Sequence, residues 1–221
     1  RRIRAQMMTG YRSAHMFLAP QPAMPMPQLD NIHAIGPVAR CGIRQKLSLC
    51  EHYGIPKHVN IVLVALGGIA TDIPLDLWPR MENTAWLFTT AVGPLERGDL
   101  LEVSAEALSF IDVLASVDVV LTKPGYGTYA EAVCNAVPVL SIERPDWPET
   151  AVLNRWVRQH GHLELMTREQ FYQGTFAPLV RALLAADAGP GMQPSGISQA
   201  AQLIQSLLPA ASRAPGTGLS V

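Results

Sequence analysis

Short apolar runs alternate along this chain with longer segments in which apolar residues recur every three or four positions. The short runs are rich in Val, Ile and Leu, which is typical of strands buried on both faces of a sheet, and the longer segments have the period of amphipathic helices. Strands that alternate with helices favour βαβ units and a parallel sheet. The predicted strands are residues 60–66, 84–89, 100–104, 118–122, 137–142 and 162–166. We therefore predict an α/β fold, a Rossmann-like parallel six-stranded sheet with helices on both faces.

Helical periodicity fills most of the chain between these strands. The predicted helices are residues 43–53, a short one at 74–81 broken by Pro79, 108–116, one that begins at Thr128, 147–160, 168–186 and 199–208. The helix from Thr128 lies between two predicted strands, so it forms a βαβ unit with them.

Residues 1–40 differ from the rest of the chain. They contain a predicted helix at 3–13, a short predicted strand at 15–19 and a proline-rich connector at 20–27, whose prolines cannot donate ladder hydrogen bonds. Because the chain opens without an initiator Met and inside a helix, we expect residues 1–40 to be the end of a missing N-terminal domain plus a linker. Residues 41–209 are then the Rossmann-like domain, and residues 210–221, rich in Gly, Pro and Ser, a disordered tail.

The loop 123–127, Lys-Pro-Gly-Tyr-Gly, is the strongest candidate for chemistry. It follows a buried strand, so it lies at the carboxyl end of a parallel sheet, where open α/β folds bind their ligands. Gly67 and Gly68 end the first predicted strand on the same side. Gly125 and Gly127 carry no Cβ and let a ligand approach the backbone closely.

An anion suits this loop. The first amides of the helix from Thr128 have no intrahelical partners, the helix dipole adds positive potential, and Lys123 supplies a full charge. These features predict a phosphate site. An alternative stays open, because Thr128-x-x-Glu131 fits a capping box that would satisfy the same amides internally.

A dinucleotide fingerprint also fits here. Gly125-x-Gly127-x-x-Ala130 matches GxGxxA, and Glu143 ends the next strand about where a ribose-binding acid belongs. Two observations disfavour NAD: Pro124 places a rigid residue before the first glycine, and this is not the first βα unit of the sheet, where the fingerprint normally lies.

Composition narrows the class of protein. With 221 residues, 48% hydrophobic and 16% charged, the chain is globular, and a net charge of −1 gives no electrostatic case for nucleic acid. No apolar run approaches the ~18 residues that cross a bilayer, and none is long enough for a signal peptide. Cys41, Cys50 and Cys134 show no metal-ligand spacing, so we expect reduced thiols in a cytoplasmic protein without a bound metal. His160 and His162, near a turn, are expected to be surface residues.

Several segments together carry a family resemblance. They are Leu63–Gly68, Ala115–Val120, the Gly-Thr-x-x-Glu-Ala element within Lys123–Ala132, Val137-Pro138 and Arg144–Glu149. In this order they look like the carboxyl-terminal half of a GT-B glycosyltransferase. The chain is similar to the peptidoglycan-precursor N-acetylglucosaminyltransferase family and to the glycosyltransferase-like region of L-arabinokinase, over roughly residues 35–168.

The resemblance implies a role for each matched position. In such enzymes this half binds the nucleotide sugar, and an N-terminal Rossmann-like half binds the acceptor. The implied donor-site residues are Gly67 and Gly68 near the diphosphate, Lys123, Gly125, Gly127 and Thr128 around it, Glu131 on the ribose hydroxyls, residues 106–108 against the base, and Glu149 with Asn154 toward the donor sugar.

The implied reaction is glycosyl transfer from a nucleoside-diphosphate sugar, UDP-type favoured, with the departing diphosphate stabilised electrostatically and no cofactor or metal. The implied partners are the nucleotide sugar and the missing N-terminal domain, which would supply the general base, so this chain alone is expected to have little or no activity. No nucleic acid and no membrane span are expected, while peripheral membrane association stays open.

Two departures leave the sugar and the activity open. Lys123 stands where many relatives have His or Arg, and Trp147-Pro148-Glu149 replaces a loop that usually bears Gln or His. The alternatives are a binding-only, inactive nucleotide-sugar module, an epimerase-like domain and an NAD-binding domain.

Overall fold

The computed structural model describes residues 2–67, 73–90, 97–103 and 108–208. The chain divides into two compact units, one of Arg1–Val38 with Pro194–Val221 and one of Ala39–Gln193. None of the helices in the described part of the chain is long and apolar enough to cross a membrane.

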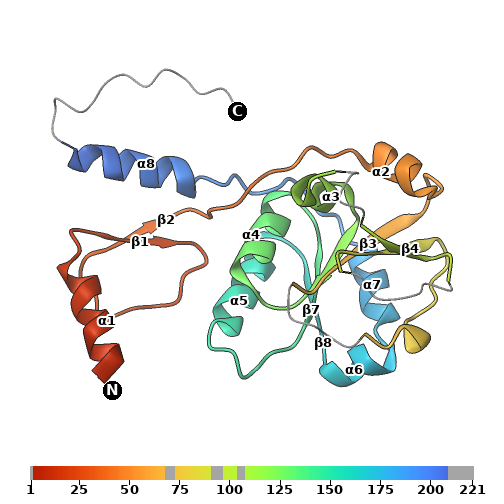
Figure 1. Ribbon diagram of the computed structural model, residues 1–221, viewed down its shortest axis with the longest axis horizontal. Coiled ribbons are helices and arrows are strands. Elements are labelled where there is room, and N and C mark those ends of the chain that lie inside the picture. The colour runs from red at the N-terminus through yellow and green to blue at the C-terminus, as the bar shows by residue number, and fades with distance from the viewer. Residues whose placement is uncertain (1, 68–72, 91–96, 104–107, 209–221) are drawn as a thin grey trace. The chain divides into compact units, whose positions relative to one another are not determined.

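The larger unit is built on one parallel sheet (Figure 1). Its strands are β3 (Asn60–Ala65), β4 (Thr84–Phe88), β5 (Leu100–Glu102), β6 (Val119–Thr122), β7 (Val139–Ile142) and β8 (Leu163–Met166). They lie in the order β5-β4-β3-β6-β7-β8, and every neighbouring pair is parallel. The predicted fold class is therefore confirmed.

The strand order creates a switch point between β3 and β6. From β3 the chain moves outward through β4 to β5, and it then returns to β6 on the other side of β3. This is the order of dinucleotide-binding Rossmann folds, in which the crevice outside the carboxyl ends of the two central strands binds the ligand.

Both faces of the sheet are covered, which explains the uninterrupted apolar strands. In β3, Ile61 and Leu63 join one hydrophobic cluster while Val62 and Val64 join the other. The first cluster includes side chains of α2 (Lys46–Tyr53), α3 (Phe110–Ser116), α4 (Tyr126–Cys134) and α5 (Thr150–His160). The second includes side chains of α6 (Arg168–Gln173) and α7 (Ala177–Leu184), on the opposite face in Figure 1.

The second face is organised by Trp78, which is almost fully buried. Its ring centroid lies 5.1 Å from that of Phe176 and 5.5 Å from those of Trp86 and Phe171. The backbone before it forms only the short 3-10 helix η1 (Leu75–Leu77), not a helix over 74–81. Packing of the Trp78 ring therefore determines this segment more than helix propensity does.

One long predicted helix is divided. Residues 168–186 form two helices, α6 and α7, because Gly174 ends the first with a left-handed φ of 66°. A side chain there would collide with the carbonyl of Leu77, so only glycine lets the two segments approach.

The smaller unit contains α1 (Arg2–Ser13), the parallel pair β1 (Phe17–Pro20) and β2 (Ile32–Ile35), and α8 (Gly196–Leu207). Helix α8 belongs to this unit and is hydrogen-bonded to the segment after β2. Gly196 N donates to Pro37 O at 3.0 Å, and Gly36 N donates to Gln199 Oε1 at 2.6 Å. We had expected residues 41–209, which include α8, to form one domain, whereas the structure groups α8 with the N-terminal segment. The expected tail 210–221 lies outside the described residues.

Candidate functional site

Two bends meet where β3 and β6 end. Ala65 and Thr122 are register partners, and Thr122 Oγ1 donates to Ala65 O at 2.7 Å. Gly67, two residues further along, has a left-handed φ of 71°. A methyl group added to it would lie 3.7 Å from both Cε and Nζ of Lys123. The structure thus brings Gly67 and Lys123 together at the switch point, while Gly68 lies outside the described residues.

The loop leads into α4 earlier than predicted. Gly125 is the N-cap in extended conformation, and the helix begins at Tyr126, so Gly127 and Thr128 lie in its first turn. The capping-box interpretation is wrong, since Thr128 is already helical and no side chain caps this helix in the described structure. Gly127 is exposed, with no described atom within 4 Å of where a Cβ would stand, so the start of α4 has open space beside it.

Two other helices that start at this edge, α3 and α6, are capped by their own side chains, whereas α5 is not. Ser109 caps α3 by accepting from Asp112 N at 3.3 Å, and α6 has a full capping box between Thr167 and Gln170. Helix α4 therefore keeps first-turn donors for another partner, as an anion site requires.

Glu131 lies one turn beyond Gly127 and Thr128 on the same helix. Its Oε1 accepts from Arg40 Nε at 2.8 Å, and its side chain is 13% exposed against 66% for Arg40. Asn135, a further turn along, holds the same segment: its Nδ2 donates to Arg40 O at 3.0 Å and its Oδ1 accepts from Gly42 N at 2.8 Å. The carboxylate is thus fixed in direction at the flank of the loop.

A second cation lies near Lys123. Arg144 follows β7, and β7 pairs with β6 through Thr122 and Ser141. Partial burial lowers the pKa of Lys123, and the positive charge of Arg144 lowers it further. No role was expected for Arg144 from the sequence. The signal that could have found it is its position: Arg144 follows β7, the strand that pairs with β6, and Lys123 follows β6.

The residues matched to the donor sugar separate in the structure. Glu149 is exposed at the start of α5, and no described contact joins it to Lys123 or Glu131. Asn154 is buried, and its Oδ1 accepts from Tyr129 Oη at 3.0 Å, which ties α5 to α4. Burial raises the pKa of Tyr129 to about 12, so the phenol stays a donor. Of the matched base wall, residues 106–108, the first two lie outside the described residues.

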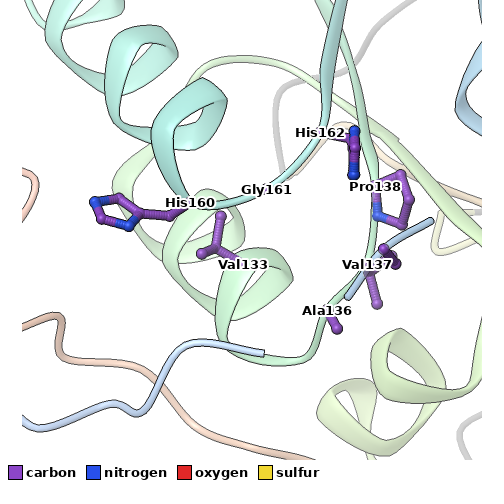
Figure 2. Close-up of a pocket in the computed structure, with 8 residues that line it drawn as sticks. Val133, Ala136, Val137, Pro138, His160, Gly161 and His162 are labelled. Carbon is purple, nitrogen blue, oxygen red and sulfur yellow. The ribbon is translucent and has the colours of Figure 1, made fainter. Parts of the chain in front are cut away.

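The two histidines lie before the amino end of β8, at the edge of the sheet opposite to the candidate site. They stand beside a small pocket (Figure 2). His160 and His162 flank Gly161 beside a cavity of about 10 Å³, room for one water molecule at most. A ring nitrogen of His162, Nε2, lies 2.8 Å from Asp187 O. Cys41, Cys50 and Cys134 are free thiols, and in the described part of the chain no three His, Cys, Asp or Glu side chains gather as a metal ion would need.

Comparison with solved structures identifies the fold as that of GT-B glycosyltransferases. The kitacinnamycin glycotransferase has a TM-score of 0.58 and 16% identity, covering 83% of this chain and 51% of that one. The calicheamicin glycosyltransferase CalG4 has a TM-score of 0.56 and 18% identity, covering 84% of this chain and 49% of that one. The spinosyn forosaminyltransferase SpnP has a TM-score of 0.58 and 13% identity, covering 86% of this chain and 55% of that one. At these identities the likeness establishes the fold alone, and the chain spans about half the length of each structure.

Among curated proteins, the chain is similar to L-arabinokinase of Arabidopsis thaliana, with 26% identity over 161 residues. The match covers 70% of this chain and 15% of that protein. No family model matches the chain.

Proposed function

We propose that this chain is the nucleotide-sugar-binding part of a glycosyltransferase, which transfers a glycosyl group from a nucleoside-diphosphate sugar to an acceptor. The observation that carries the proposal is the meeting of Gly67 and Lys123 at the switch point of the sheet, beside a helix start without a side-chain cap. This is the place where open α/β folds bind ligands, and its donors and charge suit phosphate oxygens.

The diphosphate would lie across this edge. The backbone at Gly67 and the first turn of α4 offer close approach and N–H donors, and Lys123 adds a charge-assisted hydrogen bond. The ribose would lie toward Glu131, whose Oε2 accepts no hydrogen bond within the described part of the chain. A ribose hydroxyl can donate to that oxygen while Arg40 holds the other.

In the proposed reaction, the bond between the anomeric carbon and the diphosphate oxygen breaks as the acceptor oxygen bonds to that carbon. Negative charge grows on the departing diphosphate, and donors already aimed at it stabilise the transition state without rearranging. The proton of the acceptor hydroxyl would go to a base on another part of the protein. We therefore expect the chain of 221 residues to bind the donor without efficient turnover.

Calorimetric titration with UDP tests this proposal, with GDP, dTDP and ADP as further nucleotides and NAD as the competing ligand. The expected result is saturable binding of at least one nucleoside diphosphate, weakened in Glu131→Gln. Binding of NAD in preference to every diphosphate, or no heat with any nucleotide at about 1 mM, which corresponds to a binding free energy weaker than about −4 kcal/mol, would contradict it.

Transfer itself is tested on the longest natural protein that contains this chain, by release of UDP from UDP-sugars with and without an acceptor mixture. A protein that binds the nucleotide but never releases it from a sugar would be a binding module and not a transferase.

A further inference from the structure

Two positive side chains at the carboxyl edge of the sheet, Lys123 and Arg144, have no acidic partner in the described part of the chain. The described ion pairs are Arg40–Glu131, Lys46–Asp118, Lys57–Glu51, Arg97–Asp99 and Arg168–Asp146. Lys123 and Arg144 are both partly buried, so water screens them less than it screens a fully exposed charge. Unpaired charges at such a place are costly for a folded chain, and an anion would balance them.

The two cations are near each other. Each follows one of two paired strands, β6 and β7, whose last partners are Thr122 with Ser141. The Lys123 side chain extends across to Gly67, and the charge of Arg144 is close enough to act on it. The two like charges repel each other, so binding of an anion between them would relieve that repulsion.

Arg144 is held in position by its own loop. Its guanidinium carbon lies 5.1 Å from the centroid of the Trp147 ring, a cation–π contact. Its carbonyl accepts from Trp147 N at 3.1 Å and from Thr150 Oγ1 at 2.9 Å, which closes the loop before α5. The planar guanidinium donates no hydrogen bond to the described residues, so its fork of N–H groups is available to a phosphate.

We propose that Lys123 and Arg144 form a two-cation site for the two phosphates of the donor, and that Arg144 thereby selects diphosphate over monophosphate nucleotides. This inference rests on the proposed function. A diphosphate ester of a sugar presents two phosphate groups, one for each cation. A nucleoside monophosphate carries a similar charge, about −1.5 to −2, but on a single phosphate group, so it would contact only one of the two cations. Because the Trp147 ring orients the guanidinium before binding, little freedom is lost when the phosphate arrives.

The test compares UDP with UMP, and inorganic pyrophosphate with inorganic phosphate, by calorimetric titration of the wild-type chain and of Arg144→Gln. We expect Arg144→Gln to weaken UDP and pyrophosphate about tenfold or more, as loss of a charged hydrogen bond does, and UMP and phosphate about threefold or less. Arg158→Gln, which removes an exposed charge at the far end of α5, is the matched control and should change neither. Thermal melts show whether each variant is folded.

Arg144→Lys provides a second variant with the charge retained and the fork lost, and it should recover only part of the UDP affinity. Unchanged UDP and pyrophosphate affinity in both variants would overturn the inference and leave the proposed function standing. An equal loss for UDP and UMP would overturn the selection of diphosphates. Pyrophosphate binding without UDP binding would instead refute the nucleotide-sugar function while the anion site remained.

Discussion

The two edges of the central sheet differ in how their partly buried cations are paired; the ion pair Arg168–Asp146 at the carboxyl edge joins exposed side chains. At the amino edge, Arg97 donates to both carboxylate oxygens of Asp99, at 3.0 and 2.6 Å, and to Trp78 O at 2.7 Å. There too, Asp118 accepts from Lys46 Nζ and from Ile61 N at 2.8 Å. At the carboxyl edge, Lys123 and Arg144 have no acid partner in the described structure.

The difference separates charges that hold the fold from charges that await a ligand. A buried cation that is paired with an acid stabilises the fold, because without it the acid would be left buried and without its hydrogen bonds. A partly buried cation without an acidic partner does not stabilise the fold, and such a group is a candidate for ligand binding. Substitutions at the two edges should therefore divide into effects on unfolding and effects on binding.

Arg97→Met should produce the largest change. Its side chain is 10% exposed, and its loss would leave Asp99 without a cation and remove the side-chain donor to the carbonyl of Trp78. We expect the free energy of unfolding, measured in urea titrations, to fall by about 2–3 kcal/mol, since Arg97 is nearly buried while Asp99 is 26% exposed. Arg158→Met, at an exposed position, is the control. A loss no greater than in the control would mean that the amino edge is not held by its charges.

Glu131→Gln comes next, and it should act on binding. We expect UDP affinity to fall about tenfold, because a hydrogen bond to a charged group contributes roughly 1.5 kcal/mol or more. Since Arg40 is 66% exposed, the lost ion pair should lower the free energy of unfolding by less than about 1 kcal/mol. Calorimetry and urea unfolding of the same preparation measure both. A large loss of stability with unchanged affinity would place Glu131 among the structural charges.

Asp112→Asn should give a smaller, pH-dependent effect on stability. Hydrogen bonds from Ile43 N and then from the Ser109 hydroxyl lower the pKa of Asp112 below its ordinary value. A carboxylate whose pKa is lower in the folded state stabilises the fold above its unfolded pKa, and this contribution disappears as the pH falls through the folded pKa. Melting curves from about pH 7 down to about pH 2 should therefore show wild type and variant converging in acid. Parallel curves throughout would contradict this.

Lys123→Met should change stability least. With no acid partner to strand in the described structure, and with repulsion from Arg144 relieved, the free energy of unfolding should stay within about 0.5 kcal/mol of wild type. The same urea titrations decide this. A loss as large as that of Arg97→Met would erase the distinction between the two edges.

The sequence predicts the sheet of this protein well because its central strands β3, β4 and β6 are apolar runs with both faces buried, a signal that needs no knowledge of distant contacts. It fails where tertiary contacts decide. The division at Gly174 depends on the carbonyl of Leu77, far away in the sequence. The partner of Glu131 is Arg40, and no periodicity relates the two.

The candidate site divides in the same manner. Strand ends predict that Gly67 and Lys123 share an edge, because neighbouring parallel strands end together. The sequence does not show that Arg144 has no acidic partner within the described residues, since that depends on where the folded chain places its acids.

The hydroxyl of Thr122 that bridges to the carbonyl of Ala65 has a mechanical consequence. This hydrogen bond joins the two central strands next to Gly67 and Lys123, and it resists their separation there. The site would then select anions by size as well as by charge, and a branched or sulfonated analogue of equal charge should bind more weakly.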